Sequence, residues 1–172
     1  MKKLNTFLFI LLLAFNSSAQ NLATTIRVQG MEMGNALIKN DFNTFIKYMH
    51  PSIIDFAGGR EHMKAKMDSG YQAMKQFGVS FQRYWIGIPG PIIEHNNQLQ
   101  AILPQGTTMK TPFGIVTAES SLLVISNDKG RSWWFIDTNV YKAEKLKNIL
   151  PDLSPKLVVP PMKKPKIEPI KE

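Results

Sequence analysis

The sequence predicts an α+β domain in which helices come first and antiparallel strands follow. Two observations predict this class. Apolar residues recur at helical spacing between residues 21 and 77, and segments rich in β-branched and aromatic residues, separated by turn-forming residues, follow from residue 79 to residue 137. The chain of 172 residues contains no internal repeat, which argues against a propeller built from similar blades.

Apolar spacing and capping residues predict the first two helices. Residues 21–39 carry apolar side chains at helical spacing, although Gly30 and Gly34 each weaken a helix by about 1 kcal/mol relative to alanine. Small residues on a helix also permit close packing against a sheet. Asp41 is expected to cap a second, short helix. That helix ends before Pro51, because proline disfavours helical geometry at the residue that precedes it.

A brief strand over residues 52–56 and a third helix over residues 60–77 are expected next. The strand prediction rests on the run Ser-Ile-Ile-Asp-Phe, which two glycines follow shortly after. The helix has one apolar side, and Gly78 is well placed to cap its C-terminus. Methionines suit both irregular cores and adaptable pockets, and we assign those of this apolar side to the core: Met63, Met67 and Met74.

The second half of the chain consists of predicted strands joined by short turns. We expect strands over residues 79–86, 92–94, 98–103, 115–126 and 132–137, with a turn at residues 95–97. A short helix over residues 142–150 is expected to close a domain that spans residues 20–150. Six of the eleven prolines lie in residues 151–172, interleaved with lysines, so this tail is predicted to be extended or disordered.

The turn before the last of these strands contains a short motif. Residues 126–133 read Ser-Asn-Asp-Lys-Gly-Arg-Ser-Trp, a spacing that resembles the Asp-box of sialidases and other β-propeller proteins. Sialidases repeat this motif and add an arginine cluster, whereas here it occurs once and the chain has only four arginines. We interpret it as a hairpin tip in which Asp128 accepts backbone N–H bonds, Gly130 is left-handed and Trp133 covers the turn. Calcium or sugar binding is the alternative.

The N-terminus has the features of a signal peptide. Two lysines precede the apolar run of residues 7–15, and Ser17 and Ala19 supply the small residues of a cleavage site. The apolar run is too short to span a bilayer, which takes roughly 20 residues, and an uncleaved anchor is the less favoured alternative. We therefore expect cleavage near Ala19 and an exported protein, periplasmic or secreted, that begins at Gln20. The chain has no cysteine, so disulfides, thiolate metal sites and lipidation of an N-terminal cysteine are excluded.

The positive charge is concentrated in the tail. Of the formal net charge of +8, the two N-terminal lysines contribute two and residues 142–172 a net four, which leaves a net two for residues 20–141. This distribution and the expected export argue against nucleic-acid binding. The basic tail can dock on anionic envelope surfaces or serve as a polyproline-type ligand for a partner, but we favour a solvated extension.

Two segments resemble the NTF2-like superfamily (SnoaL-like, cystatin-like fold). They are ALIKNDFNTFIKYMHPSIIDFAGGREHMKAKM, residues 36–67, and SLLVISNDKGRSWWFID, residues 121–137. The resemblance covers roughly residues 22–138. It implies a curved antiparallel sheet that wraps N-terminal helices into a cone with an apolar cavity, and a homodimer through the outer face of the sheet is one expectation. The superfamily includes isomerases, dehydratases, hydrolases, ligand binders and non-catalytic subunits, so the resemblance does not fix a function.

The resemblance implies one weak catalytic candidate. Ketosteroid-isomerase-type members place a general-base carboxylate near the first strand, where Asp55 lies, and apolar neighbours would raise its pKa. The tyrosine that such enzymes carry in the first helix is missing here, and Tyr84 and Glu119 are the conceivable substitutes on strands. The alternative is that Asp55 only caps a turn or the following helix.

Two aromatic pairs are the candidate ligand-binding residues. In each of the pairs Tyr84-Trp85 and Trp133-Trp134, adjacent strand positions point to opposite faces, so one ring of each pair faces inward. Inward rings can line the cone and stack on an apolar ligand, or they can simply fill the core.

No metal or cofactor is expected. His50, His62 and His95 are scattered without metal-ligand spacing, and no nucleotide-binding or nucleophile motif occurs. Three functions therefore remain open, in this order: a non-catalytic exported module that binds an apolar small molecule or a protein partner, a cofactor-independent lyase or isomerase that uses Asp55 as base, and an interaction protein that acts through its tail.

Overall fold

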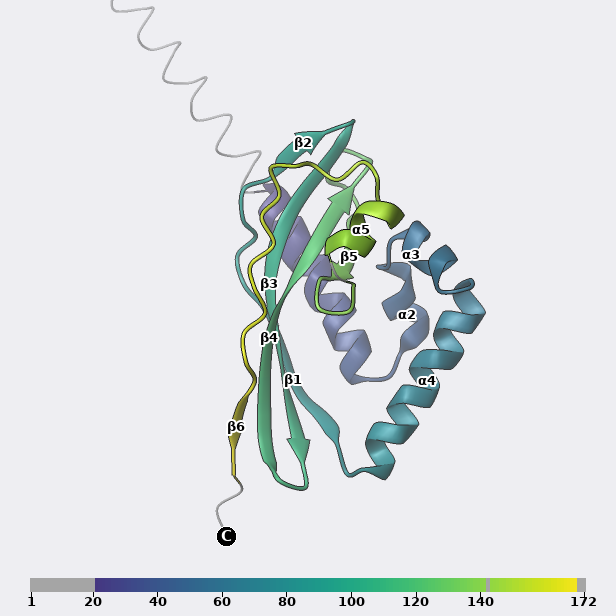
Figure 1. Ribbon diagram of the computed structural model, residues 1–172, viewed down its shortest axis with the longest axis vertical. Helices are drawn as coiled ribbons and strands as arrows, with labels where there is room; N and C mark the ends of the chain where they lie inside the picture. The colour runs from purple at the N-terminus through teal and green to yellow at the C-terminus, as the bar shows by residue number, and fades with distance from the viewer. Residues whose placement is uncertain (1–20, 142, 170–172) are drawn as a thin grey trace, which may run out of the picture.

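Helices precede strands in the computed structural model, which describes residues 21–141 and 143–169 (Figure 1). The first helix covers residues 21–38 and is followed by α2 (Phe42–Lys47), α3 (Pro51–Phe56) and α4 (Arg60–Gln76). The later elements are β1 (Ser80–Ile86), β2 (Ile93–His95), β3 (Gln98–Thr111), β4 (Gly114–Ser126), β5 (Trp134–Asp137), α5 (Ala143–Ile149) and β6 (Lys166–Glu168). Within the described ranges no helix has the length and apolar character to cross a membrane. The predicted signal peptide over residues 1–19 lies outside the described residues.

The strands form one six-stranded sheet in which all pairings are antiparallel. β1, β3, β4 and β5 lie side by side in that order, β2 pairs with β3, and β6 pairs with the part of β4 that lies beyond β5. β3 and β4 form a long central hairpin, paired from Leu99 with Ser126 to Thr111 with Gly114. The sheet is curved, with α2, α3 and α4 on its concave side and β6 on the other (Figure 1). The predicted α+β fold, with helices in the concave face of a curved antiparallel sheet, is confirmed.

Two glycines let the first helix approach the concave face closely. A Cβ atom added at Gly34 would clash with the ring of Tyr84, and one added at Gly30 would lie 3.1 Å from Phe135 and 3.2 Å from Ile86. The helix keeps these glycines although they lower its intrinsic propensity, because a larger side chain would push it away from the sheet. The predicted close packing of this helix is confirmed, and it places the Tyr84 ring beneath the helix.

The predicted strand over residues 52–56 is wrong, because these residues belong to helix α3. Pro51 occupies the first helical position, where its fixed φ suits a helix and its missing N–H removes no bond. His50 has an extended conformation (ψ 136°), as the residue before a proline should, and its Nδ1 accepts the N–H of Ser52 at 3.2 Å. The proline therefore holds His50 extended between the two helices and begins α3. The predicted cap of α2 is confirmed, since Asp41 accepts the N–H of Thr44 at 3.1 Å.

Strand β3 continues eight residues past its predicted end at Leu103. The next residue is Pro104, and a proline lacks a donor for the hydrogen-bond ladder. In the sheet its carbonyl accepts the N–H of Gly87 at 2.8 Å, just past the last β1 pair of Ile86 with Gln105. The missing N–H of Pro104 therefore faces the point where β1 leaves the sheet, and the pairing of β3 with β4 continues through Pro104 and Ser121.

The core consists of two clusters. The inner cluster lies between the first helix and the sheet: Ile26, Met33, Tyr84, Ala101, Leu103, Leu122, Val124, Trp133 and Phe135. The second cluster combines residues of α2, α3, α4 and α5 with residues of β4 and β5: Phe42, Ile46, Ile53, Met63, Leu123, Ile125, Ile136, Leu146 and Leu150. The core assignment of the α4 methionines holds for the buried Met63, while Met67 packs against the second cluster and Met74 is partly exposed.

The C-terminal segment, residues 151–169, is extended and lies along the outer side of the sheet (Figure 1). Its first part is fixed by the buried Gln100, whose amide accepts the N–H of Ser154 at 2.9 Å and donates to the carbonyl of Asp152 at 2.8 Å. Its last part pairs as β6 with Ile115 to Thr117 of β4. The tail thus forms part of the sheet structure.

Candidate functional site

An apolar cavity of about 450 Å³ lies between the concave face of the sheet and the helices. Its apolar wall consists of four methionines, five aromatic rings and aliphatic side chains: Met33, Leu37, Phe45, Met49, Phe56, Ala57, Met63, Met67, Tyr84, Leu122, Phe135, Val140 and Tyr141. The remaining lining residues are polar: Lys66, Gln105, Thr107 and Asp137. Most of the cavity surface is therefore apolar, and a limited part of it is polar.

Three polar side chains from three strands meet in the cavity wall. The Tyr84 hydroxyl donates to Oε1 of Gln105 at 2.8 Å, and Nε2 of Gln105 donates to Oδ2 of Asp137 at 2.7 Å and to the hydroxyl of Ser120 at 2.8 Å. Strand register brings them together. Gln105 pairs with Ser120, and Asp137 pairs with Leu122, two residues further along the same face of β4. We call Tyr84, Gln105 and Asp137 the polar cluster.

The pKa values of the polar cluster are set mainly by burial. Burial raises the pKa of the Asp137 carboxyl above its usual 3.8, and the hydrogen bonds that it accepts from Asn139 and Gln105 offset this only in part. Burial, and then the nearby Asp137 charge, raise the pKa of the Tyr84 hydroxyl well above its usual 10.0. Tyr84 is therefore a neutral phenol at physiological pH, and Asp137 is a carboxyl group whose charge is poorly compensated.

The catalytic candidates from the sequence do not converge on this cavity. Tyr84 is buried and lines it, but Asp55 is exposed at the end of α3 and is not a lining residue. Asp55 lies away from the cavity because the segment expected to be a strand is a helix. Glu119 pairs instead with Lys163 of the C-terminal segment, with 2.6 Å between its Oε2 and Nζ of the lysine. The pair of Asp55 and Tyr84 required for a base and a donor in one pocket is not formed.

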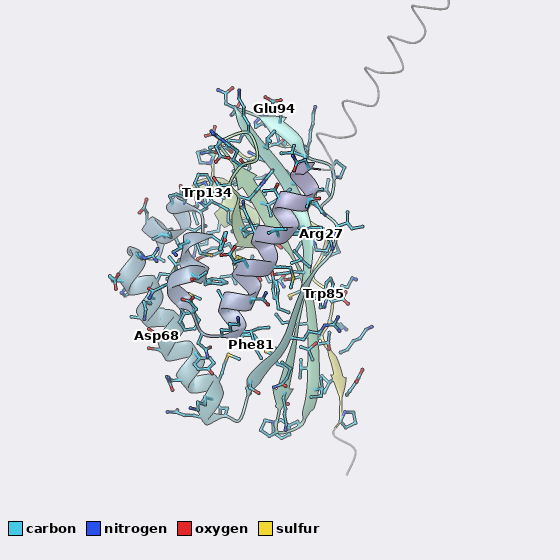
Figure 2. All side chains as sticks on the ribbon, turned by 180° about the vertical axis from the view of Figure 1, so that it is seen from behind. Arg27, Asp68, Phe81, Trp85, Glu94 and Trp134 are labelled. Atoms are coloured by element: carbon cyan, nitrogen blue, oxygen red, sulfur yellow. The ribbon has the colours of Figure 1, made fainter. Side chains whose placement is uncertain are left out.

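The three tryptophans that were predicted to bind a ligand also lie outside the cavity wall. Trp133 is fully buried in the inner cluster, and its Nε1 donates to the carbonyl of Gly130 at 3.1 Å, so it covers the hairpin turn as predicted. Trp134 packs edge-on against His50, with 5.0 Å between the ring centroids. Trp85 lies over Gly106, on the face of β1 opposite to Tyr84. Figure 2 shows Trp85 and Trp134 on separate parts of the sheet. Of the four predicted rings, Tyr84 lines the cavity.

The Asp-box turn is held together by its own side chains. Asp128 accepts the N–H groups of Arg131 at 3.0 Å and Ser132 at 2.9 Å and also bonds the hydroxyls of Ser126 and Ser132. Burial alone would raise the pKa of Asp128, but these hydrogen bonds outweigh it and lower the pKa to about 2. Gly130 has the predicted left-handed φ of 85°. Because internal donors occupy both carboxylate oxygens, the motif acts here as a hairpin tip.

The histidines form no metal site. Among the residues that the structure describes, no group of three or more histidine, aspartate or glutamate side chains is placed to hold a metal ion. His50 caps α3, and burial lowers its pKa. His62 and His95, the last residue of β2, lie outside the cavity wall.

Sequence reasoning missed Gln105 and Asp137. Gln105 follows the proline at which the strand was expected to end, so its inward position was not recognised. Asp137 follows the apolar run of residues 133–136. It lies two residues after the buried Phe135, and side chains two residues apart on a strand point to the same face. A polar residue at an inward position of a strand is the feature that would have identified both.

No protein-family model, curated protein or solved structure matches this chain. The resemblance to the NTF2-like superfamily therefore stays a prediction from the two sequence segments.

Proposed function

We propose that this protein is an exported, non-catalytic module of NTF2-like type that binds an apolar small molecule in its concave cavity. The observation that carries the proposal is the apolar cavity of about 450 Å³. Small-molecule sites in proteins typically have volumes of about 300–1,000 Å³ and combine apolar walls with a few polar groups, as this cavity does.

The composition of the wall supports an apolar ligand. Methionine side chains are flexible and polarisable, so the four that line the cavity can adjust to ligands of different shape. Transfer of an apolar molecule from water into such a cavity is favourable by roughly 25 cal/mol per Å² of buried surface, before the costs of association are subtracted.

The arrangement of the ionisable groups favours binding over catalysis. Tyr84 directs its proton to Gln105, and Asp137 accepts from Gln105 on one oxygen and from Asn139 on the other. Both groups are thus engaged in fixed hydrogen bonds. The lyase or isomerase alternative needed Asp55 beside Tyr84 in one pocket, and the exposed Asp55 does not meet that requirement.

Diphenylhexatriene, a hydrocarbon that fluoresces strongly only in apolar surroundings, tests the binding function. The wild-type protein should bind it with saturable fluorescence, and Ala57→Trp, which fills the cavity, should weaken binding by at least about tenfold. Ala65→Trp is the matched control, because Ala65 is an exposed helical alanine outside the wall. Absence of saturable fluorescence, or equal binding by both variants, would contradict the proposal.

Export is a separate part of the proposal and has its own test. It rests on the charged, apolar and small-residue segments of residues 1–19. Mass spectrometry of the protein recovered outside the cytoplasm should give an N-terminus at or near Gln20. Recovery of a cytoplasmic protein that retains residues 1–19 would refute export and leave the binding proposal untouched.

A further inference from the structure

The polar cluster offers a ligand hydrogen-bond acceptors. A carboxylate can only accept, so Nε2 of Gln105 must face Asp137, and Oε1 must then face Tyr84, whose hydroxyl donates to it. Both hydrogens of the Gln105 amide are used, one on Asp137 and one on Ser120. The acceptor oxygens of the cluster belong to Tyr84, Gln105 and Asp137, all three of which line the cavity, and the Asp137 carboxylate is held in place by donors from Asn139, Gln105, Val140 and Ser120.

Among the residues that the structure describes, no cationic side chain forms an ion pair with Asp137. The two ion pairs found among the described residues are Lys64 with Asp68 and Lys163 with Glu119, and neither involves Asp137. Lys66 lines the cavity, but it is exposed and forms no ion pair with Asp137. A partly buried carboxylate that faces an apolar cavity without a counter-charge is stabilised by any donor, and most by a cation.

Thr107, another polar residue of the wall, does not change the conclusion that the cavity offers hydrogen-bond acceptors. The hydroxyl of Thr107 lines the same cavity and can both donate and accept. It therefore tolerates a ligand donor and adds a further acceptor.

We infer that the ligand is an apolar molecule with one hydrogen-bond-donating head, a hydroxyl or a protonated amine, which binds Asp137 and the Tyr84 oxygen while its body packs on the methionines and rings. This inference rests on the proposed binding function and specifies its ligand. A hydroxyl and a protonated amine both place a hydrogen-bond donor on an apolar molecule, and the experiment below distinguishes the two.

Displacement of diphenylhexatriene by a matched series of ligands tests the inference on the wild-type protein. The series has one alkyl body and four heads: decanol, decylamine, decanoate and methyl decyl ether, all kept below their micellar concentrations. The donors decanol and decylamine should displace the probe at concentrations about tenfold lower than the ether, and decanoate should be the weakest. A further tenfold advantage of decylamine over decanol would identify a cation as the preferred head, and equality would identify an alcohol.

The variant Asp137→Asn supplies the residue-level test. An asparagine presents donors as well as an acceptor and carries no charge, so the ratio between decylamine and ether displacement should fall about tenfold. Asp55→Asn, an exposed aspartate outside the wall, is the matched control and should keep the wild-type ratio. If Asp137→Asn does not fold, Tyr84→Phe removes one acceptor oxygen from the cluster and should lower the same ratio by a smaller factor.

The outcomes separate the two levels of the proposal. Saturable probe binding with no preference for donors, or a preference that survives in Asp137→Asn, would overturn the inference and leave apolar binding intact. Failure of the wild-type protein to bind the probe or any member of the series would overturn both.

Discussion

Two buried glutamines of β3 perform different tasks on the two sides of the sheet. Gln100 points outward, where its amide bonds the backbone of Asp152 and Ser154 and so attaches the C-terminal segment. Gln105, five positions along and therefore on the opposite face, bonds the side chains of Tyr84 and Asp137 in the cavity wall. Both satisfy their amides fully, as buried polar groups must.

The difference between them lies in what surrounds their partners. The partners of Gln100 are backbone groups of Asp152 and Ser154 and the side chain of Gln98, so its hydrogen bonds hold the C-terminal segment against β3 and contribute to stability. The partners of Gln105, Tyr84 and Asp137, line the apolar cavity. Under the proposed function, Gln105 therefore orders groups that meet a ligand, whereas Gln100 attaches a segment of the chain.

The largest expected effect comes from removing the C-terminal segment. Deletion of residues 151–172 removes Leu153 and Leu157, which pack against the second core cluster, and takes away the Asp152 and Ser154 partners of the Gln100 amide. It should lower the free energy of unfolding by about 4 kcal/mol. Deletion of residues 162–172 is the matched control. It removes only β6 and the exposed ion pair of Lys163, and should cost less than about 1 kcal/mol. Urea unfolding measures both, and equal losses would show that Gln100 does not anchor the segment.

The next effect probes the inner side, where the first helix covers Tyr84. Gly34→Ala should destabilise the protein by about 3 kcal/mol, because the added Cβ clashes with the Tyr84 ring. Gly70→Ala is the control in another helix. No atom lies within 4 Å of its added Cβ, so it should stabilise α4 by up to about 1 kcal/mol. Thermal unfolding of the two variants compares them, and a neutral Gly34→Ala would contradict the close packing.

The glutamines themselves can be compared directly. Gln100→Leu should cost about 2 kcal/mol, because it leaves the buried Ser154 N–H without an acceptor and removes the bond to the Asp152 carbonyl. Gln105→Leu should cost about 1 kcal/mol, because water in the cavity can replace the lost partner of Tyr84 and Asp137. Chemical denaturation at neutral pH distinguishes them, and the reverse order would remove the contrast between the two faces.

The smallest expected effect is that two aspartates change the free energy of unfolding with pH in opposite directions. The pKa of Asp128 is lowered to about 2, so its contribution to stability is present above pH 3.8 and is lost as the pH falls towards 2. The pKa of Asp137 is raised, so its contribution is present below pH 3.8 and is lost as the pH rises through the folded-state value. As the pH rises, the Asp128→Asn variant should become less stable relative to wild type. The loss should be at most about 1 kcal/mol, because solvent screens this exposed carboxylate. The Asp137→Asn variant should instead become more stable relative to wild type as the pH rises. Unfolding free energies measured from pH 2 to 7 would show slopes of the same sign if this assignment were wrong.

Sequence reasoning succeeded where a local pattern determines the structure. The cap at Asp41, the glycine contacts of the first helix and the turn around Asp128 all depend on residues within a few positions or on one small side chain. It failed at Pro51, where proline begins a helix, and at Pro104, where the partner strand has already ended. In both cases the missing N–H of the proline breaks no hydrogen bond: at Pro51 it falls in the first turn of a helix, and at Pro104 it faces the point where β1 leaves the sheet. The neighbouring element therefore decides whether a proline interrupts a secondary structure.

The sequence alone determined the α+β class, the cap at Asp41 and the hairpin tip, because periodicity and turn chemistry are encoded in nearby residues, whereas the apolar cavity was expected from the resemblance to the NTF2-like superfamily. Tertiary structure alone decided which polar residues line that cavity. Tyr84, Gln105 and Asp137 lie on three strands, and only the register of those strands puts them on one face within hydrogen-bonding distance. Register follows from pairing across the whole sheet and from the burial of one face, so no single segment contains it.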